Sequence, residues 1–404
     1  MNGVEHNRDP SGPQIFDGIR VIDFTAVIAG SYCTRLMADL GAEVIKIEHP
    51  SGEILRHAGP MRNNTSALFS AMNSGKRCVT LDLKQQEAVI ICKKLIATCD
   101  VVVENFAPGV IGRLGLDYET LSAINPELVM CSVSGYGQSG PESARPAYAP
   151  IVQATSGYEY VYLRSQPDLK KPLNMGLPIG DTSAAQQAFG AISAALFYRE
   201  RTGIGQYIDI AMQDILLANM HKDFQTATLG EMNDRHYGPL ETTDGFVIVV
   251  PLNPHHFETL VEIIGEPELL QDPLFATTTA RIYNYDHLQK RIEKWTKTQT
   301  CDQAIDAFEE FNLPCARYRG IGDLKADPQL LHRGMLTQIE DQEGSLDVPN
   351  SPFLFSKTNA AVGNFVPRLG EDNRKILKEL GINDSEIQTL IAQKVLGKCP
   401  EEKT

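Results

Sequence analysis

The residue that most directly suggests chemistry is Asp181, in the segment PIGDTSA at 178–184. It lies between a glycine and the polar start of a long alanine-rich helix pattern, which runs from Ser183 to Glu200. At a helix start, unpaired N–H groups and the positive end of the dipole favour negative charge. A carboxylate there can cap the helix, or it can act as a nucleophile toward a substrate. For an isolated Gly-Asp-Thr the cap is the commoner case, so the choice depends on the rest of the chain.

Composition favours a soluble globular protein with more than one domain. The chain has 404 residues, of which 42% are hydrophobic and 22% are charged. This length exceeds one ordinary hydrophobic core, so we expect one large and one smaller domain. The apolar runs are too short for a membrane helix, and residues 1–13 lack the apolar core of a secretory signal.

Net charge limits the kinds of ligand that the protein could bind, and the cysteine pattern indicates its cellular compartment. Thirty-seven basic and fifty-one acidic side chains give a net charge of −14, which argues against binding to nucleic acid or to an anionic membrane. A phosphate-bearing small molecule remains compatible with this charge, because a pocket needs only local positive groups. The eight cysteines show no paired ligand spacing, so we expect reduced thiols in a cytoplasmic protein, with no disulfide framework and no metal site.

Short β-branched runs alternate with helical patterns in the first half of the chain. Strands are expected at 20–24, 43–48, 77–83, 100–104 and 128–133, and helices at 32–40 and 85–97. Such alternation implies parallel strands joined by right-handed crossovers, which is a doubly wound α/β sheet. In these sheets ligands bind beyond the carboxyl ends of the strands. Residues 29–30, 105–106, 134–136 and 181 follow strands or begin helices, so they form the candidate site.

The second half of the chain is mostly helical. A strand is expected at 246–250, and helices at 255–264, 285–297, 301–311 and 376–396. We therefore divide the chain into a flexible N-terminus (1–14), a large α/β domain (15–234), a smaller α+β domain (235–335) and a C-terminal segment that returns to the large domain (336–404).

Seven groups of residues stand in an order that is specific when they are taken together. They are GIRVIDF at 18–24, LGAEVIKIE at 40–48, NSGKR at 73–77 leading into LDLK at 81–84, ENFAPG at 104–109, SGYG at 134–137, Gly180 with Asp181, and GIGQ at 203–206. In this order they resemble the family III (CaiB/BaiF) CoA-transferases, a group of formyl-CoA, carnitine-CoA and succinyl-CoA-dependent transferases that includes the α-methylacyl-CoA racemases. The match is strong over about 15–225 and weaker to about 395.

The resemblance implies a fold and a mechanism. The fold is a Rossmann-like large domain with a small domain, and two chains threaded through each other as interlocked rings in a homodimer. The mechanism makes Asp181 the nucleophile, which forms an acyl-aspartyl anhydride and then an aspartyl-CoA thioester before CoA passes to the acceptor acid. Backbone N–H groups near the helix start would hold the oxyanion, a contribution of about 3 kcal/mol.

The resemblance also assigns contacts with CoA, which is a substrate here; no tightly bound cofactor is expected. The matching residues are Ile28, Ala29, His49, Leu81, Lys84, Asn105, Phe106, Ala107, Arg113, Ser134, Gly135 and Tyr136. Lys84 and Arg113 are the natural phosphate partners, because cations pair strongly with phosphate oxygens. The alternative for each is a solvated helix surface. His49 stands where some members carry arginine, so it is equally an ordinary loop histidine.

Several residues depart from particular branches of the family. Tyr148 occupies the place of the second base of the racemases, and a tyrosine with a pKa of about 10 is a poor base at neutral pH, which favours a transferase. Tyr148 and Ile28 are candidates for the acyl pocket. Formyl-CoA members carry Gln at the place of Ile28, Lys at that of Ser134 and a run of glycines where 233–244 has only Gly238. These differences argue against oxalate as the acceptor and favour a bulkier or less polar acyl group.

Other interpretations stay open at this point. Arg56, Arg62 and Arg145 either hold the far carboxylate of a dicarboxylic acid or form structural ion pairs. The leading function is transfer of CoA from an acyl-CoA donor to a carboxylic acid; the alternatives are an acyl-CoA racemase and an acyl-CoA-binding protein without activity. A dinucleotide dehydrogenase is disfavoured, because neither a Gly-x-Gly-x-x-Gly after the first strand nor a Walker loop is present. The donor and acceptor acids are not evident from the sequence.

Overall fold

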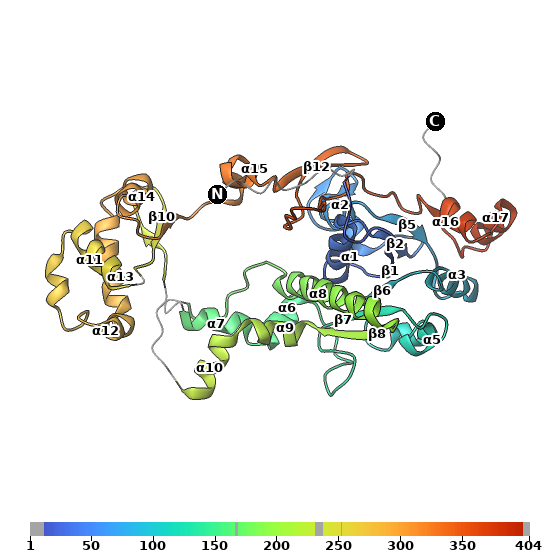
Figure 1. Ribbon diagram of the computed structural model, residues 1–404, viewed down its shortest axis with the longest axis horizontal. Helices are drawn as coiled ribbons and strands as arrows, with labels where there is room; N and C mark the ends of the chain where they lie inside the picture. Colours follow the sequence, from blue (N-terminus) through green and yellow to red (C-terminus); the bar gives the residue numbers. More distant parts are fainter. Residues whose placement is uncertain (1–11, 166–168, 231–236, 252, 399–404) are drawn as a thin grey trace. The chain divides into compact units, whose positions relative to one another are not determined.

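The computed structural model describes residues 12–165, 169–230, 237–251 and 253–398 (Figure 1). Contacts divide the chain into two units: one takes the chain up to His221 and again from Leu331, and the other is Lys222–Leu330. Residues 1–11 of the segment predicted to be the N-terminus (1–14), and residues 233–236 of the stretch 233–244, lie outside the described residues.

A six-stranded sheet organises the larger unit. Its strands are β1 (Arg20–Asp23), β2 (Glu43–Glu48), β5 (Arg77–Thr80), β6 (Val101–Glu104), β7 (Val129–Ser134) and β8 (Gln206–Ala211). The spatial order is β5-β2-β1-β6-β7-β8, and every neighbouring pair is parallel. Counted along the chain this is the order 3-2-1-4-5-6 of Rossmann-type sheets. The predicted parallel α/β sheet is confirmed; β8 was not predicted.

The two faces of the sheet bury alternate residues of each strand, as strand geometry requires. On one face, Val21 and the residues of the other strands that point the same way, such as Val44 and Val101, pack against α1 (Ala29–Asp39), α8 (Ile179–Thr202) and α9 (Met212–Asn219). Ile22 and its equivalents pack against α3 (Gln86–Ile96), α16 (Asn373–Glu379) and α17 (Asp384–Ala392). Because both faces are covered, the central strands are mostly apolar, which is why the sequence pattern revealed them.

Smaller elements complete this unit. They are the 3-10 helix η1 (Ile54–His57), β3 (Met61–Arg62), β4 (Thr65–Ser66), α2 (Ala67–Asn73), α4 (Val110–Arg113), α5 (Tyr118–Ser122), α6 (Ala149–Thr155), α7 (Tyr158–Ser165), and the antiparallel pair β12 (Leu336–Asp341) and β13 (Gly344–Pro349).

Several predicted boundaries were wrong for local reasons. The strand expected at 77–83 ends at Thr80, because Leu81 turns away to bridge Leu396. The single helix expected at 376–396 is two helices, since Gly381 between them has a φ of 78°. The helix expected from Ser183 begins at Ile179, so Asp181 lies inside its first turn.

The second unit has its own core. A three-stranded antiparallel sheet of order β11-β10-β9 joins β9 (Leu240–Glu241), β10 (Phe246–Val249) and β11 (Cys315–Arg317). Its helices are α10 (His221–Leu229, which begins one residue before the boundary), α11 (Pro254–Ile263), η2 (Pro267–Gln271), α12 (Thr278–Tyr283), α13 (Tyr285–Thr296), α14 (Cys301–Glu309) and η3 (Ile321–Ala326), with α15 (Pro328–His332) at the junction. Within the described ranges of both units, no helix is long and apolar enough to cross a membrane.

Candidate active site

The carboxyl ends of the parallel strands bring most of the predicted CoA-binding residues to one edge of the sheet. Ile28 and Ala29 follow β1, His49 follows β2, Leu81 and Lys84 follow β5, residues 105–107 follow β6, and residues 134–136 end and follow β7. Arg113 closes α4, and its guanidinium reaches back toward Gly109 in the loop after β6. Proximity at this edge follows from the parallel topology; a role in binding CoA remains a prediction for each residue.

These residues differ in how accessible their side chains are. Lys84, Ala107 and Arg113 are exposed, and in the described part of the chain neither cation belongs to an ion pair. His49 is also exposed, with its ring Nδ1 2.7 Å from the Ser51 hydroxyl. Leu81 is only 1% exposed and packs in the core, so only its backbone is available to a ligand.

Asn105 organises the loop between β1 and α1. Its side-chain amide donates to the Ala26 carbonyl at 2.8 Å and accepts from the Ala26 N–H at 2.9 Å. Both ends of the amide are therefore used on the loop that leads into Ile28, the N-cap of α1. The residue before it, Glu104, is buried, and burial raises its pKa to about 7 although the Phe106 N–H donates to it at 2.8 Å.

The segment after β7 is fixed by close packing. A Cβ at Gly135 would lie 2.2 Å from the Cβ of Ala147, so only glycine fits there. The Ser134 hydroxyl accepts from the Gly137 N–H at 3.0 Å. The Tyr136 hydroxyl lies 3.1 Å from that of Thr155, which ties this loop to α6.

Asp181 lies in the first turn of α8 without capping it. The N-cap is Pro178 and no side chain caps the helix, so the interpretation of Asp181 as a cap is wrong. Its carboxylate is partly buried, and burial alone raises its pKa to about 6. None of the described residues donates a hydrogen bond to it or forms an ion pair with it, so no donor offsets the effect of burial on its pKa. Asp181 therefore forms neither an ion pair nor a helix cap with the described residues.

Contacts of Gly180 place Asp181 beside the carboxyl ends of β7 and β8. A Cβ on Gly180 would lie 3.6 Å from the sulfur of Met212, the first residue of α9 after β8. The N–H of Gln213 in turn donates to the Gly135 carbonyl at 3.1 Å. The first turn of α8 therefore neighbours the segment where sequence analysis placed CoA contacts.

The residues that pack against this turn include two from α6. Gly180 also faces Ala149, which follows Tyr148, and the Tyr148 side chain is 69% exposed at the N-cap of α6. The Gly180 N–H donates to the buried Gln153 amide at 3.3 Å. Tyr148 is therefore next in the chain to a residue that packs on the Asp181 turn, and its ring is available to a ligand.

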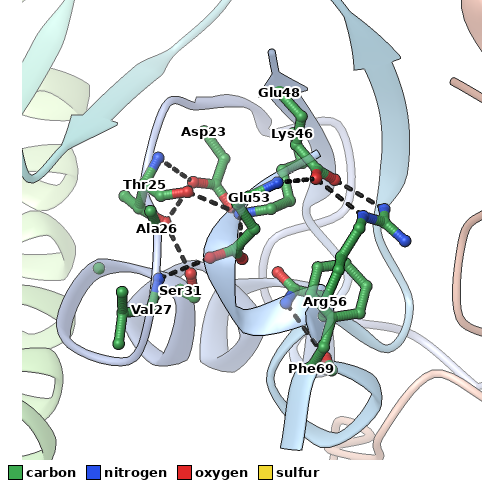
Figure 2. Close-up of polar contacts among 12 residues, drawn as sticks. Asp23, Thr25, Ala26, Val27, Ser31, Lys46, Glu48, Glu53, Arg56 and Phe69 are labelled. Carbon is green, nitrogen blue, oxygen red and sulfur yellow. Dashed lines mark hydrogen bonds and ion pairs between the residues drawn. The ribbon is translucent and has the colours of Figure 1, made fainter. Parts of the chain in front are cut away.

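The three arginines considered for a distant carboxylate form ion pairs. Both nitrogens of the Arg56 fork bind Glu48, at 2.8 and 2.7 Å, while its guanidinium lies 3.9 Å from the ring centre of Phe69 (Figure 2). Arg62 lies 3.6 Å from Asp341. Arg145 pairs on the surface with Glu142 at 3.0 Å. The ion-pair alternative therefore describes all three, and most firmly the enclosed Arg56.

A buried charge cluster next to the β1–α1 loop escaped sequence analysis. Lys46 in β2 and Lys76 before β5 are each 0% exposed, and both face Asp23 or the loop that follows it. Burial raises the pKa of Asp23, but the two lysines and two threonine hydroxyls outweigh it and hold that pKa at about 2. Lys46 in the middle of the predicted strand EVIKIE was the available signal, because central strands of a parallel sheet are buried on both faces.

Comparison with known proteins decides the family. The model of CoA-transferase family III matches residues 16–373. This chain belongs to that family. As a family III CoA-transferase it is an enzyme, which confirms the resemblance described above and disfavours a binding protein without activity.

Individual relatives match most of the length of this CoA-transferase. A mouse succinyl-CoA:glutarate CoA-transferase is 31% identical over 394 residues, which cover 94% of this chain and 90% of the relative. An acetyl-CoA:oxalate CoA-transferase of Acetobacter aceti is 35% identical over 358 residues, covering 86% and 90%. A crystal structure of a CaiB/BaiF family protein from Brucella suis aligns with a TM-score of 0.79 at 32% identity, covering 91% of this chain and 100% of that one.

Proposed function

We propose that this CoA-transferase moves CoA from an acyl-CoA donor to a carboxylic acid through covalent intermediates on Asp181. The observation that carries the proposal is the state of that carboxylate: it is partly buried, has no ion pair, and lies beside the carboxyl edge of the sheet. A pKa of about 6 leaves it mostly ionised at neutral pH, yet more basic than an ordinary aspartate. Both properties suit a nucleophile.

The reaction balances in four substitutions. The Asp181 carboxylate attacks the donor thioester carbonyl, and CoA leaves as the thiolate, giving an acyl-aspartyl anhydride. The thiolate then attacks the aspartyl carbonyl and releases the donor acid, leaving an aspartyl-CoA thioester. The acceptor carboxylate attacks this thioester and expels the thiolate again. The thiolate finally attacks the acceptor acyl carbonyl, which forms the new acyl-CoA and restores Asp181.

CoA itself would be held along the carboxyl edge. The exposed Lys84 and Arg113 are the proposed phosphate partners, since neither is neutralised by a carboxylate within the described residues. The loops after β1, β6 and β7 would contact the remainder of the molecule through their backbone. Ile28 and Tyr148 are the proposed lining of the acyl pocket.

The proposed acids are short-chain dicarboxylic acids, with succinyl-CoA as the first donor to test. The mouse relative named for succinyl-CoA and glutarate supports this choice. The relative named for oxalate shows that acceptor preference varies at similar identity, so Ile28 in place of the glutamine of formyl-CoA members is the feature that favours an acceptor larger than oxalate.

We also propose a homodimer, interlocked by analogy with the family, in the cytoplasm. The support for association is the apolar surface of α8 and the segment after it, where Phe197 is 65% exposed, Tyr198 48% and Ile204 55%. Light scattering coupled to gel filtration tests it, and a particle of one chain mass would contradict it.

The decisive experiment is trapping of the intermediate. The protein is incubated with succinyl-CoA, acetyl-CoA and longer acyl-CoAs, treated with hydroxylamine or borohydride, and mapped by mass spectrometry. A modification at Asp181 that is lost in a folded Asp181→Ala variant supports the proposal. Wild-type transfer by that variant refutes the assigned nucleophile. Binding of CoA without any adduct, together with exchange of the donor α-proton for deuterium, would assign a racemase instead.

A further inference from the structure

Val27 has a backbone conformation that its side chain disfavours. Its φ is 62°, in the left-handed region, which β-branched residues avoid because their Cβ substituents crowd the backbone. The other non-glycine residues with positive φ in the described part of the chain are Asn63, Asn312 and Lys394, none of which is β-branched. Such a conformation persists only where the surroundings enforce it. Val27 directly precedes Ile28, at the end of the loop between β1 and α1.

Side chains form hydrogen bonds with the backbone of each of the three loop residues Thr25, Ala26 and Val27. The Asp23 carboxylate accepts the Thr25 N–H at 2.8 Å, and Lys46 donates to the Thr25 carbonyl at 2.6 Å. The Asn105 amide holds both backbone groups of Ala26, as described above. Glu53 accepts the N–H of Val27 at 2.8 Å (Figure 2). The strained residue is thus held at the end of a fully bonded segment.

Glu53 and Lys46 depend on each other. The Lys46 ammonium lies 3.3 Å from the Glu53 carboxylate, and their side chains are 0% and 7% exposed. Removing either one would leave the other buried charge less well compensated, which is costly, although Asp23 also faces Lys46. Glu53 therefore has two tasks, because one oxygen faces Lys46 and the other binds the Val27 N–H.

Glu53 is itself held in place by the neighbouring ion pair. Its N–H donates to Glu48 at 3.1 Å, and the same Glu48 carboxylate receives the fork of Arg56 (Figure 2). Glu53 is the N-cap of η1, the 3-10 helix that contains Arg56. The loop between β2 and η1 therefore presents a fixed carboxylate to the loop between β1 and α1.

The start of α1 packs directly on the held loop. A Cβ at Gly30 would lie 2.3 Å from the methyl carbon of Thr25, so the helix approaches as closely as glycine permits. The hydroxyls of Thr25 and Ser31 lie 3.0 Å apart. Ile28 and Ala29 connect these two points, so their positions follow from the conformation of Val27.

We propose that Lys46 and Glu53 are positioning residues of the acyl-CoA site, which hold Val27 in the left-handed conformation and thereby set Ile28 and Ala29. The roles of Ile28 and Ala29 in binding acyl-CoA rest on the proposed function. Neither Lys46 nor Glu53 touches substrate in this proposal. Their effect passes through the backbone of Val27.

The proposal is tested by suppression with glycine, which adopts a positive φ without the crowding that valine suffers. Glu53→Gln keeps the shape of the side chain but removes the charge that pairs with Lys46 and weakens the acceptor for the Val27 N–H. We expect the KM for succinyl-CoA and the dissociation constant for CoA to rise roughly tenfold, the size expected for the loss of a hydrogen bond to a charged group. Adding Val27→Gly is expected to restore most of this loss, because the loop no longer needs the restraint.

A matched control uses another residue with positive φ. Asn312 has a φ of 57° in the exposed turn after α14, in the other unit. Glu53→Gln with Asn312→Gly is expected to bind CoA as weakly as Glu53→Gln alone. Equal rescue by both glycines, or no rescue by Val27→Gly, overturns the proposal, since a merely structural role for Glu53 would lower stability without a specific suppressor.

Separate readouts keep this test distinct from the proposed function. Affinity for CoA is measured by titration calorimetry and stability by urea unfolding, beside the rate of transfer. If Glu53→Gln does not fold, Val27→Ala is the second variant. Alanine keeps a Cβ at a positive φ, so this variant should bind CoA no more tightly than the wild type. Tighter binding of CoA would overturn the proposal. If the wild-type protein binds CoA but forms no adduct at Asp181, the proposed nucleophile is wrong. The positioning role of Lys46 and Glu53 is still decided by whether Val27→Gly restores CoA affinity.

Discussion

Replacing Asp181 with asparagine should abolish CoA transfer and, at the same time, stabilise the protein at neutral pH. The amide is too weak a nucleophile to form the anhydride, so transfer is lost. The stabilisation follows from burial without a partner: the ionised carboxylate has lost water and gained no donor in exchange. Asparagine has nearly the same shape and carries no charge.

The size and the pH window of this effect come from the raised pKa. Burial moves the pKa of Asp181 from an ordinary 3.8 to about 6. Between these values the folded state binds more protons than the unfolded state, so the stability of the wild type falls as pH rises through the window. Above the window the whole cost is present, roughly 3 kcal/mol at 1.36 kcal/mol per pH unit. Below pH 3.8 the group is protonated in both states and the cost disappears.

The assay is urea unfolding of both proteins at several pH values from 4 to 8, with transfer followed by separation of the acyl-CoA products. Asp181→Asn should exceed the wild type by about 2–3 kcal/mol above pH 6 and match it near pH 4. The control is Asp214→Asn, which removes an exposed carboxylate from the first turn of α9 and should destabilise by about 0.5 kcal/mol at neutral pH. An Asp181→Asn protein that is no more stable than wild type at pH 7.5, or that transfers CoA normally, would refute the reasoning.

Three further outcomes are expected. Arg56→Met leaves its buried carboxylate partner unpaired and should lower the free energy of unfolding by about 3–5 kcal/mol; a loss under about 1 kcal/mol would show that the pair is dispensable. Gly135→Ala places a Cβ 2.2 Å from that of Ala147 and should cost about 1–3 kcal/mol in urea unfolding, with unchanged stability contradicting the packing. Lys84→Ala and Arg113→Ala should each raise the KM for acyl-CoA roughly tenfold at constant kcat, and steady-state kinetics that show no change in KM would remove them from the phosphate site.

The sheet could be predicted from sequence where burial is complete. Val101–Glu104 and Val129–Ser134 are buried along their whole length and read as strands. Strand β8 was missed because it is an edge strand of mixed burial, in which Tyr207 and Asp209 are exposed. The C-terminal helices share one periodic pattern, and the positive φ of Gly381 and the capping box of Asn383 separate them.

The candidate site also contains residues that could be predicted from the sequence and residues that could not. Residues that follow strands could be located, since topology alone brings the carboxyl ends of parallel strands together. The link between Glu53 and Val27 could not, because it depends on the conformation of two loops and on a side chain 26 positions away. The unpaired state of Asp181 was equally hidden, since a first-turn aspartate without a partner has the same sequence signature as a helix cap.

The covering of β5 has a consequence for how the nascent chain matures on the ribosome. β5 ends the order of the sheet, and its free side is closed by the segment that leads into α16. Asp372 accepts the Cys78 N–H at 2.9 Å, and Asn373 accepts that of Thr80 at 2.8 Å, across a separation of 293 residues in the latter case. Until translation reaches those residues, the strand offers an open edge of the kind to which other extended chains add. Newly made protein therefore exposes this edge of the sheet until the last part of the chain emerges from the ribosome.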